Sequence, residues 1–284
     1  MIMKKLPFQI DLTDKVVVIT GAGGLICGEF ALALGQTGAK VALLDLNEEA
    51  AQKYADEIVA NGGKAKGYKC NVLEKDSIQA AHDAIVADFG KCDILINGAG
   101  GNNPKASTDD EYFEESHLNN MKTFFDLDQK GIEFVFNLNY MGSLLPTQVF
   151  ALDMMGKKGC QIINISSMNA FTPLTKIPAY SGAKAAISNF TQWLATHFSK
   201  VGIRCNAIAP GFFSTAQNKA LLWNEDGTPT ARTGKILAGT PMGRFGEVDE
   251  LIGALLFLCC EDASGFVNGV VIPVDGGYNA YSGV

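Results

Sequence analysis

The chain has 284 residues, of which 47% are hydrophobic and 19% charged, with a formal net charge of −7 at pH 7. This length accommodates one large α/β domain with a substantial core. The acidic balance, without a dense Lys/Arg block, argues against a nucleic-acid partner. The opening MIMKKLPFQIDLTDKV lacks the apolar run of a signal peptide, and no apolar run approaches the roughly 20 residues that span a bilayer. We therefore expect a cytoplasmic protein without a membrane partner.

The cysteine and histidine patterns do not favour a metal centre. The chain has seven cysteines, an odd number that predicts reduced thiols packed as small hydrophobic residues. The adjacent Cys259 and Cys260 lack the C-x-x-C spacing of metal or redox pairs, and the histidines form no H-x-x-x-H pair. We predict that the protein holds no metal.

Apolar stretches rich in valine and isoleucine predict strands at residues 16–19, 41–44, 66–70, 94–96, 162–165, 204–208 and 270–274. Helical periodicity follows over 48–60, opened by Asn47 as N-cap, and over 75–89. This alternation predicts an α/β fold, a single doubly wound parallel sheet with helices on both faces. Because no Pro- or Ser-rich linker divides the chain, we expect residues 1–284 to form one domain.

Two long stretches interrupt the alternation. Residues 101–128 are polar and acidic, and residues 212–247 surround the sequence LLWNEDGTPT. Loops of this length inside a compact domain are usually lids, binding loops or disordered segments. Both follow the carboxyl end of a predicted strand, which is the edge where open α/β sheets bind ligands. We expect both inserts to border a substrate.

The first predicted strand runs into the glycine-rich sequence TGAGGLICG. Its glycines match neither G-x-G-x-x-G nor T-G-x-x-x-G-x-G, because Leu25 and Cys27 stand where the later glycines of the second pattern belong. A strand, a glycine turn and a helix nevertheless form the layout of a dinucleotide-binding loop. A plain tight turn in the core stays open as the alternative.

In a cofactor loop each glycine of this sequence has an expected task. Gly21 makes the turn, Gly23 and Gly24 let the backbone approach a pyrophosphate, and Gly28 allows close packing of helix and sheet one position late. The backbone amides of Leu25 and Ile26 still face the phosphates, because a backbone donor does not depend on its side chain.

Asp45 ends the second predicted strand in the sequence VALLDLN. An acid at this point accepts both ribose hydroxyls of an adenosine and repels a 2′-phosphate, which predicts NAD(H) in preference to NADP(H). The alternative is that Asp45 only caps the next helix.

Tyr180 and Lys184 lie one turn apart in the helical stretch PAYSGAKAA. A nearby ammonium favours the phenolate, so we expect Lys184 to lower the pKa of Tyr180 and make it a general acid/base between an alcohol and a carbonyl. The same stretch contains S-x-x-K, the nucleophile signature of β-lactamases, but neither S-D-N nor K-T-G accompanies it.

Two further polar positions fit the same chemistry. Ser167, at a strand end in NISSMNA, offers a hydroxyl that can hold a substrate oxygen against the tyrosine. Asn137 and Asn139 lie in a long helical stretch, where a buried amide caps, bridges or holds a water that relays protons to the lysine.

These motifs, in this order, resemble the short-chain dehydrogenase/reductase superfamily over essentially the whole chain. The resemblance implies a Rossmann-type fold with Tyr180 as general acid/base and Ser167 polarising the substrate oxygen. It also implies that Lys184 lowers the Tyr180 pKa and binds the nicotinamide ribose, and that Asn139 holds the relay water. Further implied cofactor contacts are Asn71, Val72, Asn97, Gly98, Ala99, Gly100, Pro210, Gly211, Phe213 and Thr215. Asn71 departs from the family, which commonly has an Asp there.

Within that superfamily the long insert, NISSMNAFTPLTKIPAYS, NFTQWLA and the ending DGGYNAYSGV resemble the mannonate oxidoreductase (fructuronate reductase) branch. That branch implies hydride transfer between NAD and a sugar acid, D-mannonate to D-fructuronate or the reverse, in a homotetramer or dimer. Hydroxyl and carboxylate partners on the expected site loops are Asn102, Asn103, Asn169, Lys176, Gln217 and Asn218. We expect Lys176 to bind the carboxylate, with Arg232 or Arg244 as the alternative.

Two other functions stay open. One is a dehydrogenase of the same superfamily for another polyol or keto-sugar acid, such as gluconate. The other is a non-catalytic NAD-binding sensor or scaffold, against which the complete Ser, Tyr, Lys and Asn set argues.

Overall fold

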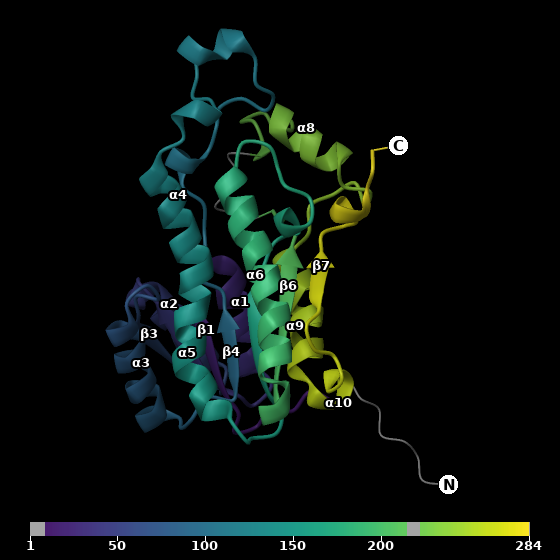
Figure 1. The fold of residues 1–284 in the computed structure, drawn as a ribbon. Coiled ribbons are helices and arrows are strands. Elements are labelled where there is room, and N and C mark those ends of the chain that lie inside the picture. Colours follow the sequence, from purple (N-terminus) through teal and green to yellow (C-terminus); the bar gives the residue numbers. More distant parts are fainter. Residues whose placement is uncertain (1–8, 215–221, 284) are drawn as a thin grey trace.

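The computed structural model describes residues 9–214 and 222–283, built around one seven-stranded sheet in the order β3-β2-β1-β4-β5-β6-β7 (Figure 1). All of the neighbouring strands pair in parallel. The strands are β1 (Val16–Thr20), β2 (Lys40–Asp45), β3 (Lys64–Lys69), β4 (Ile94–Asn97), β5 (Cys160–Ile165), β6 (Ile203–Pro210) and β7 (Val271–Val274). The strand order reverses between β1 and β4, and ligands of such sheets bind at this switch point.

Helices cover both faces of the sheet. The helices are α1 (Leu25–Gly35), α2 (Glu48–Ala60), α3 (Lys75–Asp88), α4 (Gln129–Phe136), α5 (Gly142–Met154), α6 (Pro178–His197), α8 (Ala231–Ala238), α9 (Ile252–Cys259) and α10 (Glu261–Ser264). Helices α1, α2 and α9 pack on one face, and α3, α5 and α6 pack on the other. A short π-helical turn, Asn137–Met141, joins α4 to α5.

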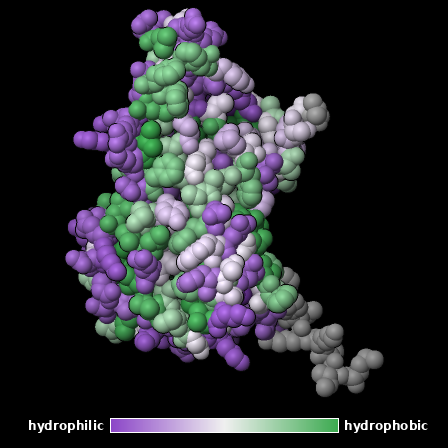
Figure 2. All heavy atoms as spheres, viewed as in Figure 1, coloured by the Kyte–Doolittle hydropathy of each residue, from purple (hydrophilic) through white to green (hydrophobic). Residues whose placement is uncertain are grey.

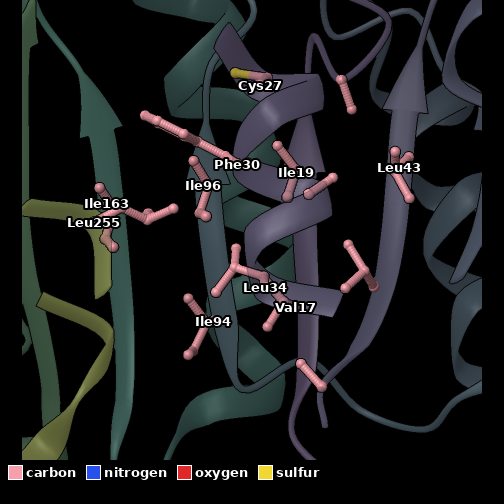
Figure 3. Close-up of a cluster of buried hydrophobic side chains, with 14 of the residues drawn as sticks. Val17, Ile19, Cys27, Phe30, Leu34, Leu43, Ile94, Ile96, Ile163 and Leu255 are labelled. Atoms are coloured by element: carbon pink, nitrogen blue, oxygen red, sulfur yellow. The ribbon is translucent and has the colours of Figure 1, made fainter. Parts of the chain in front are cut away.

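The alternation of side chains along β1 explains the two layers. Val17 and Ile19 point to the core under α1 (Figure 3). Val16 and Val18 belong to the core on the other face, under α5. Every residue of β1 is buried, as expected of a central parallel strand covered on both faces. All seven cysteines are buried, and six of them, all but Cys260, lie in these two cores.

The predicted fold class is confirmed, and each predicted strand is present with ends that differ by a few residues. The predicted helix over 48–60 has those bounds, with Asn47 accepting a hydrogen bond from the Ala50 amide as its N-cap. The second insert was expected to be a loop, which is wrong in part. It contains α8, opened by Thr230 as N-cap, and a small core of Leu222, Ile236 and Phe245.

The first insert follows β4, holds only three short 3-10 turns within residues 101–128, and stands above the carboxyl ends of the strands, beside α8 (Figure 1). It exposes large side chains such as Tyr112, Phe124 and Phe125, next to acidic ones, and Figure 2 shows hydrophobic and hydrophilic residues side by side on this lobe. Over residues 9–214 and 222–283, no helix is both long and apolar enough to cross a membrane.

Candidate active site

The glycine turn after β1 is shaped by close backbone contacts. Gly21 has φ +69°, and a Cβ there would lie 2.8 Å from the backbone N and Cα of Ala99. The Gly23 amide donates to Asp45 Oδ2 at 2.9 Å, so the second strand holds the turn. Since Gly23 packs against Asp45 and Ala50, Gly24 rather than Gly23 faces the cleft.

A cleft of about 460 Å³ runs over the carboxyl ends of β1 to β4. Its walls are Gly21, Gly24, Leu25, Ile26, Cys27, Asp45, Leu46, Cys70, Asn71, Val72, Gly98, Ala99, Gly100 and Leu138. Gly28 donates the first α1 hydrogen bond, to Gly24, so the amides of Leu25 and Ile26 precede it, and no side chain caps this helix. An uncapped helix N-terminus beside glycines, with a carboxylate at the next strand end, fits a dinucleotide.

The helix–sheet contact expected of Gly28 is made instead by Cys27 and Gly98. A Cβ on Gly98 would lie 2.1 Å from Cys27 Sγ, so the glycine after β4 makes room for the thiol. Gly28 faces α2, and a Cβ on it would lie 2.3 Å from the Tyr54 ring. The position of Gly28 is therefore explained by packing between two helices, not by packing against the sheet.

Asp45 holds two backbone amides, with Oδ1 accepting from Asn47 and Oδ2 from Gly23, each at 2.9 Å. A carboxylate has about four acceptor positions, so both oxygens keep capacity for ribose hydroxyls. The helix cap itself is Asn47, not Asp45. Asn71 lines the cleft, but its side-chain amide is already bonded to Glu74 and to the Leu73 backbone.

The segment after β4 is fastened by two buried polar side chains. Asn97 donates to Thr147 Oγ1 at 3.0 Å and to Asn164 Oδ1 at 2.9 Å, so it joins the sheet to α5. Thr20 Oγ1 accepts from the Gly98 and Ala99 amides at 3.1 and 3.2 Å. Thr20 is not among the residues predicted for the site, although its place directly before the glycine turn is a signal for it.

Tyr180, Ser167 and Lys184 converge at the carboxyl end of β5. Tyr180 lies in the first turn of α6, and the Ser167 side chain is close enough to its phenol to lower the Tyr180 pKa. Lys184 is buried, with Nζ donating to the Ile165 carbonyl at 2.8 Å and lying 5.6 Å from the centre of the Tyr180 ring. A Cβ on Gly100 would lie 3.1 Å from Lys184 Nζ, so the lysine reaches the wall of the cleft.

Asn139 is buried in the π-helical turn, a feature frequent at functional sites. All three hydrogen bonds of its side chain are to protein backbone. Nδ2 donates to the Gly101 and Val135 carbonyls, each at 2.7 Å, and Oδ1 accepts from the Gly101 amide at 3.2 Å. The expected relay water is thus not needed to satisfy this amide, which fastens the start of the first insert.

The pKa of Tyr180 differs from the expectation. Burial raises it above its usual value, the Ser167 hydrogen bond lowers it, and Lys184 is not among the groups that shift it. Burial also lowers the pKa of Lys184 to about 8. The physical reason is that desolvation opposes both charged forms when neither has a close counter-charge.

The segment after β6 carries the other expected nicotinamide contacts. The Gly211 amide donates to the Val274 carbonyl at 2.9 Å, and a Cβ on Gly211 would lie 2.6 Å from Asp275 Cα. The Phe213 side chain is buried against Gly246 and lines neither wall of the cleft. Three expected contacts, Thr215, Gln217 and Asn218, lie outside the described residues.

A second cavity, of about 510 Å³, lies between the inserts. Its lining is Glu111, Pro173, Leu174, Thr175, Lys176, Ile177, Phe212, Ala231, Arg232, Lys235, Ile236 and Tyr278. Lys176, expected to bind the carboxylate, and Arg232, one of its two alternatives, both line this cavity. Arg244 lies elsewhere, with both terminal nitrogens bonded to the Glu250 carboxylate at 2.6 Å.

The expected asparagines behave differently from one another. Asn102 donates to Ser107 within the first insert, and Asn103 caps the 3-10 turn Pro104–Ala106. Asn169, two residues after Ser167, is buried, and its side-chain oxygen has no hydrogen-bond partner among the residues described. An unpaired buried amide beside a reactive site is a candidate ligand for a substrate hydroxyl.

Comparison with known proteins places this site in a family. A family model described as short chain dehydrogenase matches residues 15–226. The chain belongs to the short-chain dehydrogenase family. An uncharacterized oxidoreductase from Haemophilus influenzae is 68% identical to this short-chain dehydrogenase over 274 residues, which cover 96% of each chain. The chain is therefore an oxidoreductase with the Rossmann-type fold of that family.

Solved structures show the same fold with both nicotinamide cofactors. A provisionally named D-mannonate oxidoreductase from Haemophilus influenzae, with bound NAD, matches this dehydrogenase with a TM-score of 0.94 and 68% identity, over 96% of this chain and 98% of that one. A gluconate 5-dehydrogenase from Burkholderia cenocepacia, in complex with NADP and tartrate, matches with a TM-score of 0.80 and 29% identity, over 97% and 99%.

Proposed function

We propose that the chain is an NAD(H)-dependent dehydrogenase that interconverts a sugar acid and its keto form, with D-mannonate and D-fructuronate as its substrates. The observation that carries this proposal is the convergence of Tyr180, Ser167 and Lys184 at the carboxyl end of β5. Lys184 Nζ lies against Gly100 in the wall of the cleft, and the loop 173–177 just before Tyr180 lines the cavity between the inserts. One end of this arrangement fits a dinucleotide, and the other is lined by cations.

In the reducing direction Tyr180 is the proton donor. Because burial keeps its pKa above the usual value, the phenol is protonated at neutral pH. It donates this proton to the carbonyl oxygen, while the Ser167 hydroxyl holds the same oxygen in place. The cleft residues, Asp45 among them, would hold NADH, which would supply a hydride for the carbonyl carbon; this hydride and the proton from Tyr180 together account for the change from ketone to alcohol. Lys184 and Asn139 position the backbone at this end of the cleft, through their hydrogen bonds to Ile165 and Gly101.

Asp45 supports NAD(H) as the preferred cofactor. Its carboxylate ends β2 at the wall of the cleft, and a 2′-phosphate placed there meets a like charge. The NAD-bound relative agrees with this choice, and the NADP-bound relative shows that family membership alone does not decide it.

The cavity between the inserts supports an acidic substrate. Lys176 and Arg232 line it, and neither has a carboxylate partner among the described residues. Asn169 offers an amide to a hydroxyl. The second candidate is oxidation of gluconate at C5, which is favoured by the likeness to the gluconate 5-dehydrogenase.

The homo-oligomeric state also stays a prediction, which light scattering would check.

The deciding experiment measures kcat/KM for a panel of substrates from the change in NADH or NADPH absorbance. D-fructuronate, 5-keto-D-gluconate and D-fructose would be reduced with NADH and with NADPH, and D-mannonate, D-gluconate and D-mannitol oxidised in reverse. We expect the highest kcat/KM for D-fructuronate with NADH. A higher kcat/KM for 5-keto-D-gluconate would favour the second candidate, and equal values for acids and neutral sugars would contradict both.

A further inference from the structure

The cavity between the inserts holds more cations than one carboxylate requires. Lys176 comes from the loop before α6, and Arg232 and Lys235 come from α8. The first insert contributes one acid, Glu111, whose Oε2 lies 2.6 Å from Lys235 Nζ. Across this cavity, one of the three cations is therefore already neutralised by the protein itself.

The backbone conformation of Lys176 is unusual and is stabilised by the first insert. Lys176 has φ +70°, a left-handed conformation that costs a residue with a side chain about 1 kcal/mol or more. Its carbonyl accepts a hydrogen bond from the Thr108 amide at 2.8 Å, so the first insert stabilises this conformation. The insert thus contacts the cavity twice, at Lys176 through its backbone and at Lys235 through Glu111.

Glu111 is placed as a substrate carboxylate would be. Its side chain is partly buried, and the pKa of its carboxyl is lowered, first by the hydrogen bond from Lys235 and then by the charges of Lys235 and Lys176. The Glu111 carboxyl is therefore ionised at neutral pH, and its negative charge repels an anion that enters the cavity.

We propose that Glu111 sets the charge selectivity of this cavity, by engaging Lys235 so that only Lys176 and Arg232 are left for the substrate. This inference rests on the proposed use of the cavity for a sugar acid. The cavity then accepts one carboxylate and discriminates against a second, so that a sugar with acid groups at both ends binds poorly. Removal of the Glu111 charge frees Lys235 and relaxes that discrimination.

The test is the binding of three ligands of similar size to the enzyme saturated with NADH. D-glucitol is neutral, D-gluconate carries one carboxylate and D-glucarate carries two. Dissociation constants would be measured by calorimetry for the wild type, Glu111→Gln and the control Glu115→Gln, which alters a neighbouring acid of the insert that does not line the cavity. Binding does not depend on turnover, so the result is separate from the substrate panel.

We expect Glu111→Gln to strengthen glucarate binding about tenfold and gluconate binding about threefold, since one repulsive charge is lost and one ammonium is freed. Glucitol binding and the Glu115→Gln control should not change. Both gains should shrink in 0.5 M salt, because these charges are partly exposed.

Other outcomes are equally clear. Unchanged glucarate affinity in Glu111→Gln, equal gains for all three ligands, or the same gain in Glu115→Gln would each overturn the inference. Failure of the wild type and Glu111→Gln alike to bind any acid would overturn it too. If Glu111→Gln gains affinity for acids while no sugar acid is turned over, the inference stands and the proposed function fails.

Discussion

The two cavities of this enzyme are lined by different kinds of groups. The cofactor cleft is defined by backbone and buried groups, with Gly21, Gly98 and Thr20 fixing the segments after β1 and β4 against each other. The cavity between the inserts, proposed to bind the substrate, is defined by charged side chains from segments far apart in the chain, such as Glu111 and Lys235. The first region tolerates almost no added atom, whereas the second can change its charge without disturbing the core.

This contrast predicts how each region fails. A substitution in the cleft should act on stability and cofactor binding, because close contacts leave nowhere for a new group to go. A substitution in the cavity should act on KM for the substrate and leave the fold intact, because its side chains are solvated. A substitution of Tyr180, the proposed proton donor, should affect kcat alone.

The largest effect is expected at Tyr180. Tyr180→Phe removes the hydroxyl that donates the proton but keeps the ring, so kcat for ketone reduction should fall about 1000-fold. Binding of NADH, followed by fluorescence, should stay within about twofold of the wild type, since the cleft walls are untouched. Unchanged turnover with the best substrate would contradict the assignment of Tyr180, and a lost NADH signal would mean that the cleft itself had been disturbed.

The next effect tests the packing of the cleft. Gly98→Ala places a Cβ 2.1 Å from Cys27 Sγ and 2.8 Å from the Thr20 carbonyl, so the free energy of unfolding should fall by about 3 kcal/mol. Gly101→Ala is the matched control, because its Cβ meets only a Leu138 methyl at 3.8 Å.

Removing the Cys27 thiol should show how much of the loss caused by Gly98→Ala comes from the contact with Cys27 Sγ. In a Cys27→Ala background the loss caused by Gly98→Ala should be smaller by about 1 kcal/mol, as urea unfolding of the four proteins would measure. Strict additivity of the two substitutions would show that Cys27 and Gly98 do not make the close helix–sheet contact.

Asp45 is expected to give the third effect. Asp45→Asn keeps an acceptor oxygen for one of the two amides, that of Gly23 or that of Asn47, and removes the charge that repels a 2′-phosphate. The ratio of kcat/KM for NADPH to that for NADH should rise on the order of 100-fold, as expected from relief of a like-charge contact. Wild-type preference for NADPH would refute the argument, and an unchanged ratio in the variant would limit Asp45 to holding the glycine turn.

The buried charge of Lys184 is expected to lower the free energy of unfolding of the protein. Burial lowers its pKa to about 8 from 10.5, so below pH 8 the folded state carries a poorly solvated charge. Between these values the unfolded state binds more protons, so wild-type stability should rise as the pH increases from 8 to 10.5. Lys184→Met should therefore abolish activity while stabilising the cofactor-free protein by about 2 kcal/mol at pH 7.

Urea unfolding at pH 7 and pH 9.5 would measure this difference, which should narrow at the higher pH. Lys130→Met, on an exposed position of α4, serves as the control and should change stability little at either pH. A Lys184→Met variant that is less stable than the wild type at pH 7 would show that the bond to the Ile165 carbonyl outweighs the cost of burial.

The sequence predicted the first region better than the second, for a physical reason. Strands and the Tyr180–Lys184 pair are encoded by neighbouring residues, so their periodicity and spacing can be read locally. The partners of Gly28 and Gly98, Tyr54 and Cys27, come from other elements and depend on how the helices pack. Helix α8 was overlooked because Thr230 and the apolar pair at 236 and 237 lie within a polar stretch.

The substrate region depends still more on distant contacts. The ion pair of Glu111 and Lys235 joins two inserts, and no local pattern indicates that these residues meet. For the same reason the sequence could not choose between Arg232 and Arg244, which differ in their partners rather than in their surroundings along the chain. The raised pKa of Tyr180 likewise follows from burial, which spacing does not reveal.

The smallest expected effect separates those two arginines. Arg232→Met should raise KM for the sugar acid about tenfold with kcat unchanged, because Arg232 lines the substrate cavity without a carboxylate partner in the part of the chain described. Arg244→Met should change KM less than about twofold, since both terminal nitrogens of Arg244 already bind Glu250. Measurement of KM for D-fructuronate and D-fructose in both variants checks this, with the neutral sugar unaffected by either. The reverse order of effects would move the carboxylate to Arg244 and exclude the cavity between the inserts as its site.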